Sequence, residues 1–86
     1  MERILFRIDA KLFRNVLIMI EFEITDEYIE LNKLLKVTRV VESGAMAKAV
    51  IEDELVIRNG EIETRKRAKI RKGEVIELWD QQIKVI

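Results

Sequence analysis

Apolar residues recur along this chain with two different periods, and the change of period marks its elements. Residues 20–24, IEFEI, alternate apolar and acidic side chains, which is typical of a strand with one buried face. Apolar residues then recur every three to four positions in two segments, as on one face of a helix. We therefore predict a strand followed by helices at about 27–38 and 42–54.

Both predicted helices carry start signals and an apolar face. Thr25 and Asp26 are candidate N-caps of the first helix, and Ser43 is the candidate N-cap of the second. The apolar positions are Tyr28, Leu31, Leu34 and Leu35 in the first helix and Ala47, Val50 and Ile51 in the second. Because each set lies on one side of its helix, both sets are predicted to face a common core.

Residues 55–86 predict short strands joined by tight turns. Asn59-Gly60 favours a two-residue hairpin turn in which both residues have positive φ. Over residues 67–71, basic side chains alternate with Ala68 and Ile70, which indicates an extended segment that points these two residues inward. Lys66 breaks the alternation, so a turn into this segment is predicted nearby. Residues 75–78 and 83–86 are predicted as a last pair of strands joined through WDQQ, with Trp79 a hairpin or core residue. The order β-α-α-β-β-β is that of a small α+β domain.

The chain is predicted to divide into an N-terminal extension at 1–18 and one domain at 19–86. Ile4, Ile8 and Leu12 are spaced by four, as on a helix face, although the aromatic residues nearby fall outside this stripe. The extension is therefore either a short amphipathic helix packed on the domain or a translation artefact, since Met19 offers a second start.

The composition of the 86 residues removes much chemistry. There is no Cys and no His, which excludes disulfides, thiol nucleophiles, the usual zinc sites and the commonest general base. The three glycines are too widely separated for a phosphate-cradling loop. The longest apolar run, VLIMI, is far short of the roughly 20 residues that span a bilayer. We expect a cytoplasmic protein that is not an enzyme and needs no cofactor, metal or membrane.

Charge is distributed unevenly although the chain is neutral overall. Residues 65–72 hold six bases and no acid, whereas residues 21–30 hold five acids and no base. In an extended strand, every second residue from Arg65 to Arg71 shares one face, about 6.6 Å apart, which suits successive phosphates. The alternative is a solvated edge strand guarded by its charges. Because a solvated face normally mixes both signs, the pattern favours a polyanion site.

The start of the second predicted helix is another candidate site. Ser43 and Gly44 are small enough for a partner's backbone to approach, helix-start N–H groups attract phosphate, and Lys48 lies one turn farther on. The alternative is close packing between helices through Ser43, Gly44 and Ala45. Aromatic side chains outside the apolar segments are scarce, so a nucleic acid would be recognised by backbone and shape rather than by stacked bases.

Several short segments occur in an order and spacing that match a known family. They are LNKLLK (31–36), ESGAMAK (42–48), VIRNG (56–60), ETRKRAKI (63–70) and KGEVIEL (72–78). Together they resemble the S-four RNA-binding domain, named for a protein of the small ribosomal subunit, and within it the bacterial subgroup in which this domain forms the whole protein. The resemblance covers roughly residues 20–86.

The resemblance implies an αL motif, two packed helices against a short and mostly antiparallel β-arrangement, which binds ribosomal or transfer RNA without catalysis. By the family pattern, RNA contacts fall on the start of the second helix and on the first hairpin, and the subgroup adds its basic segment. The residues at these and flanking positions are Lys33, Arg39, Ser43, Gly44, Lys48, Arg58, Asn59, Gly60, Arg65, Lys66, Arg67 and Lys69.

Three positions depart from the family pattern. Gly44 stands where many members have Arg, which shifts RNA binding towards the basic run. Glu54 stands where many members have the Gly that ends the second helix, so that helix is expected to lack its usual C-cap. Arg58 stands where an apolar residue is common, so either the hairpin register differs or Arg58 faces RNA.

The sequence and the resemblance together predict a monomeric, cytoplasmic bacterial protein that docks on structured RNA, with ribosomal RNA or the ribosome as its partner. A binder of transfer RNA or a ribosome-rescue protein is an alternative from the same class. A protein–protein adaptor that uses the acidic 21–30 segment or the N-terminal extension is an alternative from another class.

Overall fold

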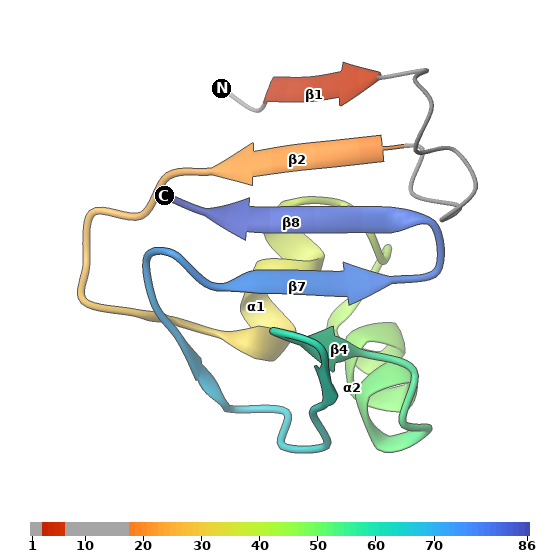
Figure 1. Cartoon of the computed structure of the whole chain (residues 1–86). Coiled ribbons are helices and arrows are strands. Elements are labelled where there is room, and N and C mark those ends of the chain that lie inside the picture. Colours follow the sequence, from red (N-terminus) through yellow and green to blue (C-terminus); the bar gives the residue numbers. More distant parts are fainter. Residues whose placement is uncertain (1–2, 7–17) are drawn as a thin grey trace.

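The computed structural model describes residues 3–6 and 18–86, which form a sheet with two helices on one of its faces (Figure 1). In chain order the elements are strands β1 (Arg3–Phe6), β2 (Ile18–Phe22) and β3 (Ile29–Glu30), helices α1 (Leu31–Val37) and α2 (Gly44–Glu52), and strands β4 (Ile57–Arg58), β5 (Glu61–Ile62), β6 (Lys69–Ile70), β7 (Val75–Leu78) and β8 (Gln81–Val85). The predicted α+β class with two packed helices is confirmed.

The main sheet has the strand order β1-β2-β8-β7-β4-β5, and β3 pairs with β6 in a separate two-stranded ladder. The C-terminal strand β8 lies between β2, to which it is parallel, and β7, to which it is antiparallel (Figure 1). Register places Ile83 beside both Ile20 and Ile76, and all three side chains are buried. The predicted alternation of residues 20–24 thus turns one face of the sheet to the core and the other to solvent.

The helices cover the apolar face of the sheet with the residues that their periodicity predicts. Leu31, Leu34 and Leu35 of α1 are fully buried. Ala47, Val50 and Ile51 of α2 are also buried and belong to the same core. Burial of one such large aliphatic side chain contributes about 1.5–3 kcal/mol, so this shared core holds both helices on the sheet.

Helix α1 begins at Leu31 rather than near residue 27, and the predicted caps Thr25 and Asp26 are wrong. Ile29 and Glu30 are extended because they pair with β6, which lies much later in the chain. This tertiary pairing overrides the local signals for a helix start. The pairing cannot be recognised from the sequence around residue 26 alone. Tyr28, predicted on the helix, instead precedes β3.

The N-terminal extension contains a strand. Residues Arg3–Phe6 form β1 and pair antiparallel with β2, so the helix interpretation is wrong for these four residues. Residues 7–17 lie outside the described part of the chain. The interpretation of Met19 as the true start stays a prediction.

The last hairpin is tighter than predicted. Strand β8 starts at Gln81 rather than at residue 83, and Leu78 pairs with Gln81 across a two-residue turn. Trp79 is a residue of this turn, one of the two predicted places for it, and is 54% exposed with φ 56°. Left-handed backbone is uncommon for a bulky residue and indicates local strain.

Helix α2 ends in a Schellman motif despite the absence of glycine. Glu54 has φ 64°, the left-handed conformation that this motif requires. The N–H of Glu54 donates to the Ile51 carbonyl at 3.1 Å, and the N–H of Leu55 donates to the Val50 carbonyl at 3.1 Å. The expectation that this helix lacks its C-cap is therefore wrong, because Glu54 accepts a conformation that glycine adopts more easily.

Replacing Glu54 by Gly is expected to stabilise the domain by about 0.5–1 kcal/mol, because it removes the left-handed strain at a small cost in chain entropy. Urea denaturation followed by circular dichroism measures the change. Asp53→Gly is the matched control, since Asp53 has φ −80° and glycine is expected to destabilise there. Equal effects of the two substitutions would contradict the assignment of strain to Glu54.

Candidate nucleic-acid interface

Residues 65–72, here called the basic loop, run from the end of the first hairpin towards β7. The turn predicted near Lys66 is confirmed, since the Ala68 N–H donates to the Arg65 carbonyl at 3.1 Å and closes it, so the residues before Ala68 are not part of a strand. Only Lys69–Ile70 forms a strand. The predicted division of side chains is confirmed, with Ala68 and Ile70 buried and Arg65, Arg67, Lys69 and Arg71 exposed.

The backbone of the basic loop is bonded to the start of α1. The N–H of Leu31 donates to the Ala68 carbonyl at 2.9 Å, and the N–H of Asn32 donates to the Lys66 carbonyl at 2.9 Å. These carbonyls satisfy helix-start N–H groups that would otherwise need a side-chain cap. The contact fixes the loop on the helix and leaves its long side chains on the outside.

Basic side chains converge around a hollow in the surface of the loop. Its lining residues are Arg58, Arg65, Arg67, Ala68, Lys69 and Arg71. Five of the six carry a positive charge, so an anion in this hollow meets several cations at once.

Tyr28 contacts the far end of the basic loop. The Lys69 ammonium lies 5.1 Å and the Arg71 guanidinium 5.7 Å from the centre of the Tyr28 ring. Both distances are within cation–π range. The aromatic ring therefore helps to place two cations at the surface, a role that its predicted position on α1 did not reveal.

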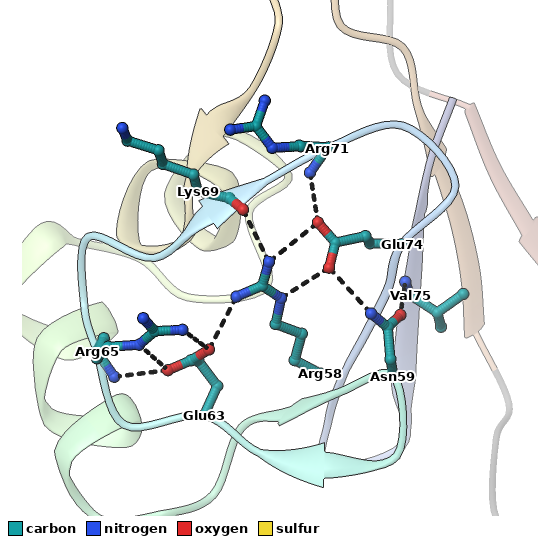
Figure 2. Close-up of polar contacts among 8 residues, drawn as sticks. All are labelled: Arg58, Asn59, Glu63, Arg65, Lys69, Arg71, Glu74 and Val75. Carbon is teal, nitrogen blue, oxygen red and sulfur yellow. Dashed lines mark hydrogen bonds and ion pairs between the residues drawn. The ribbon is translucent and has the colours of Figure 1, made fainter.

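Arg58 lies beneath the basic loop and points at two carboxylates (Figure 2). Its Nε is 2.7 Å from Glu74 Oε1 and its Nη1 is 3.0 Å from Glu63 Oε1. Its Nη2 donates to the Lys69 carbonyl at 2.9 Å. The hairpin register is regular, with Arg58 opposite Glu61. The side chain is 22% exposed and its guanidinium is committed to these contacts.

The turn of the first hairpin has the predicted form. Asn59 has φ 49° and Gly60 has φ 89°, as a two-residue turn with positive φ at both positions requires. The Asn59 amide donates to Glu74 Oε1 at 2.9 Å and its Oδ1 accepts the N–H of Val75 at 2.9 Å. Asn59 is thus used to fix the hairpin against the start of β7.

Glu63 and Glu74 are the residues that the sequence analysis missed. Hydrogen bonds from the Arg65 side chain, with further bonds from the Arg65 N–H and Arg58, lower the pKa of the largely buried Glu63 to about 2 against the opposing effect of burial. The Arg58 side chain and the Arg71 N–H likewise lower the pKa of Glu74. Both carboxylates are therefore ionised at neutral pH. The available signal was that an acid stands two positions before the basic run and another two positions after it.

The start of α2 is open to solvent. The Ser43 hydroxyl accepts the N–H of Met46 at 3.1 Å, which confirms Ser43 as the N-cap. Ser43, Gly44 and Ala45 are all exposed, and a Cβ on Gly44 would meet nothing within 4 Å. Close helix packing through these small residues is therefore wrong, and the helix start is available to a partner. Lys48, one turn farther on, is exposed as well.

Comparison with known proteins identifies this architecture. A family model described as S4 domain matches residues 22–86. The chain belongs to the S4 domain family. It is 39% identical over 59 residues to the Escherichia coli K12 protein that bears the name "Putative RNA-binding protein YbcJ", covering 69% of this chain and 84% of that protein. YbcJ of Shigella flexneri matches equally well.

A solved structure supports the same assignment for this S4 domain. The solution structure of E. coli YbcJ has a TM-score of 0.62 and 36% sequence identity, covering 77% of this chain and 85% of that one. It is described as revealing an αL motif involved in RNA binding. The resemblance inferred from the short sequence segments is confirmed.

Lys33 and Arg39 were also predicted as site residues, but they do not line the hollow in the basic loop. Lys33 is 4.0 Å from Glu30 and borders a hollow lined by acids such as Asp26 and Glu27. Arg39 follows α1 with φ 64° and lies in a third hollow with Lys36. The structure thus gathers Arg58, Arg65, Arg67 and Lys69 at one hollow but does not extend it to Lys33 or Arg39.

Within residues 3–6 and 18–86, no helix is both long enough and apolar enough to cross a membrane. The same described residues contain no group of three or more His, Cys, Asp or Glu side chains placed to hold a metal ion.

Proposed function

We propose that this protein binds folded RNA through the basic loop, with ribosomal RNA as its target, and performs no chemistry on it. The observation that carries the proposal is the fixed loop whose cations point outward. The described part of the chain offers no ion-pair partner to Lys66, Arg67, Lys69 or Arg71. These four residues are the proposed phosphate contacts.

Binding by such a surface is electrostatic. Each cation that neutralises a phosphate releases condensed counterions, which supplies affinity without reading the base sequence. Specificity then comes from the shape of the RNA and from its 2′-hydroxyl groups, because the grooves of an A-form helix offer few readable base edges. Within residues 18–86, Trp79 is the only aromatic residue whose side chain is exposed, which agrees with this mode.

The start of α2 is the proposed second contact. Ser43, Gly44 and Lys48 are exposed there, and the missing side chain of Gly44 lets an RNA backbone come close to the helix. Arg39 and Lys33 are proposed as flanking contacts. Arg65 keeps its place among the RNA contacts, since its side chain is 73% exposed although it pairs with Glu63 at 3.0 Å.

Two of the predicted site residues are proposed to support the RNA surface and not to contact RNA. Arg58 and Asn59 make their polar contacts inside the protein, to Glu63, Glu74 and neighbouring backbone groups. We therefore propose that these two residues support the RNA surface from below. The relatives' printed association with RNA binding agrees with the class of ligand proposed here.

Crosslinking in cells, followed by sequencing of the bound RNA, tests the target. We expect ribosomal RNA to dominate the crosslinked reads, and the double variant Arg67→Glu, Lys69→Glu to lose them. Reads dominated by transfer RNA would replace the ribosomal target with the transfer RNA alternative. Absence of crosslinked RNA, together with a protein partner recovered from nuclease-treated lysate, would overturn RNA binding in favour of an adaptor.

A further inference from the structure

The two carboxylates beside the basic loop have an arrangement that RNA binding alone does not explain. We propose that Arg58, Glu63 and Glu74, here called the clamp, hold the basic loop in its RNA-binding shape, so that two acids next to the RNA surface strengthen binding. Arg58 is then a positioning residue. The inference rests on the proposed function and identifies the residues that fix the shape of the proposed RNA-binding surface.

The clamp holds the basic loop at both ends through backbone groups. Glu63 Oε2 accepts the N–H of Arg65 at 3.0 Å, and Glu74 Oε2 accepts the N–H of Arg71 at 2.7 Å (Figure 2). These two amides lie near the beginning and near the end of the loop. Hydrogen bonds from a backbone amide to a carboxylate are charge-assisted and stronger than neutral ones, so they limit movement at both ends.

Arg58 joins the two ends to the middle. One guanidinium lies 3.0 Å from Glu63 and 2.7 Å from Glu74, and it also donates to the Lys69 carbonyl at 2.9 Å. The planar fork of arginine allows these simultaneous bonds, which the point charge of lysine cannot reproduce. Three points of the loop backbone are therefore connected through a single side chain.

The clamp is largely shielded from solvent. The side chains of Arg58, Glu63 and Glu74 are 22%, 9% and 16% exposed. Glu63 and Glu74 direct their charges at Arg58 and at backbone amides, and Glu63 also pairs with the exposed Arg65 at 3.0 Å. A carboxylate that is paired in this way repels RNA phosphates only weakly. Loss of its partner would leave a buried charge that water solvates poorly.

The clamp and simple charge counting predict opposite results for the same substitution. By charge counting, removal of an acid beside a cationic surface raises RNA affinity. By the clamp, removal of Glu74 releases the Arg71 end of the loop, and RNA must then pay the entropy of ordering it. The sign of the change in affinity distinguishes the two accounts.

The experiment measures affinity for a short RNA hairpin at fixed salt with Glu74→Gln and with Glu61→Gln as the matched control. Glu61 is exposed on the same hairpin, opposite Arg58, and among the described residues it forms no ion pair. We expect E74Q to weaken binding about tenfold, on the scale of one charge-assisted bond. We expect E61Q to bind equally or slightly more tightly. E74Q binding as tightly as the wild type, or more so, overturns the clamp.

A second variant, which leaves the net charge unchanged, tests the clamp even if E74Q fails to fold. Arg58→Lys preserves the charge but cannot bridge both acids, so we expect weaker binding with an unchanged dependence on salt. Faster hydrogen exchange at the Arg65 and Arg71 amides is expected in this variant without RNA. Wild-type affinity and wild-type exchange in R58K overturn the clamp. If the wild-type protein itself does not bind the hairpin, the proposed function fails, while the exchange result still decides the clamp.

Discussion

The double variant Arg67→Glu, Lys69→Glu is expected to bind a short RNA hairpin about 100-fold more weakly than the wild type, or on the order of tenfold for each reversed charge. Both side chains are exposed and line the same hollow. Because two phosphate contacts are lost, the slope of log affinity against log salt is expected to flatten by about 1.5. Titrations at several salt concentrations measure both quantities.

The matched control is Lys36→Glu, Lys84→Glu, which changes net charge equally at two exposed positions outside the basic loop. We expect the control to weaken binding only a few-fold, through loss of long-range attraction. Thermal denaturation checks the fold, with a modest decrease for the loop variant because Lys69 lies opposite Glu30. Equal losses of affinity in loop variant and control would contradict a localised RNA surface.

Acidification from pH 4.5 towards pH 2 is expected to remove about 2 kcal/mol of stability through Glu63 alone. The pKa of Glu63 falls from its ordinary 4.5 to about 2 in the folded protein, chiefly through hydrogen bonds from Arg65. A depressed pKa means that the contribution is fully present above the unfolded pKa and is lost as pH falls through the folded one. The expected loss of stability is smaller than the full change in the pKa of Glu63 would give, because solvent screens its exposed partner Arg65. Glu74, whose pKa is also lowered, adds to the loss in the same direction.

Urea midpoints at neutral pH, at pH 4 and near pH 2.5 measure this loss. Glu63→Gln is the control, since it lacks the titrating group and is expected to show a shallower dependence on pH in this range. Parallel pH profiles for Glu63→Gln and the wild type would show that other carboxylates cause the acid sensitivity.

Local periodicity was enough to predict which residues of the two helices enter the core. Leu31, Leu35, Val50 and Ile51 are buried as expected because a helix facing a sheet repeats its apolar residues at a fixed spacing, whatever partner covers them. The alternation around Ala68 was equally informative, although the segment is a turn followed by a two-residue strand. Inward and outward positions are set by which side chains tolerate water, and this holds without regular hydrogen bonding.

Contacts between distant segments escaped prediction. The pairing of Ile29 with Ile70 moves the start of α1 and places Tyr28 beside the basic loop. A strand of two residues has no period of its own, so only the partner defines it. The later start of α1 is a direct consequence of this non-local pairing.

The candidate site was predicted by residue type but not by role. A run of bases identifies a positively charged segment, in which Arg67 and Lys69 are exposed and Lys66 is half-buried. The same run gives no sign that Arg58 turns towards Glu63 and Glu74, because each of these is an ordinary polar residue within its own segment. Their common contact arises only after the hairpin and the loop are folded against each other.

The hydrogen bonds from the start of α1 to the Lys66 and Ala68 carbonyls link recognition to folding. The loop cannot detach without uncapping a helix whose leucines form the centre of the domain, and the helix cannot unravel from its first turn without releasing the loop. Loop and helix therefore open as one cooperative unit. The contacts that begin the first helix in this way protect the proposed RNA surface from local unfolding.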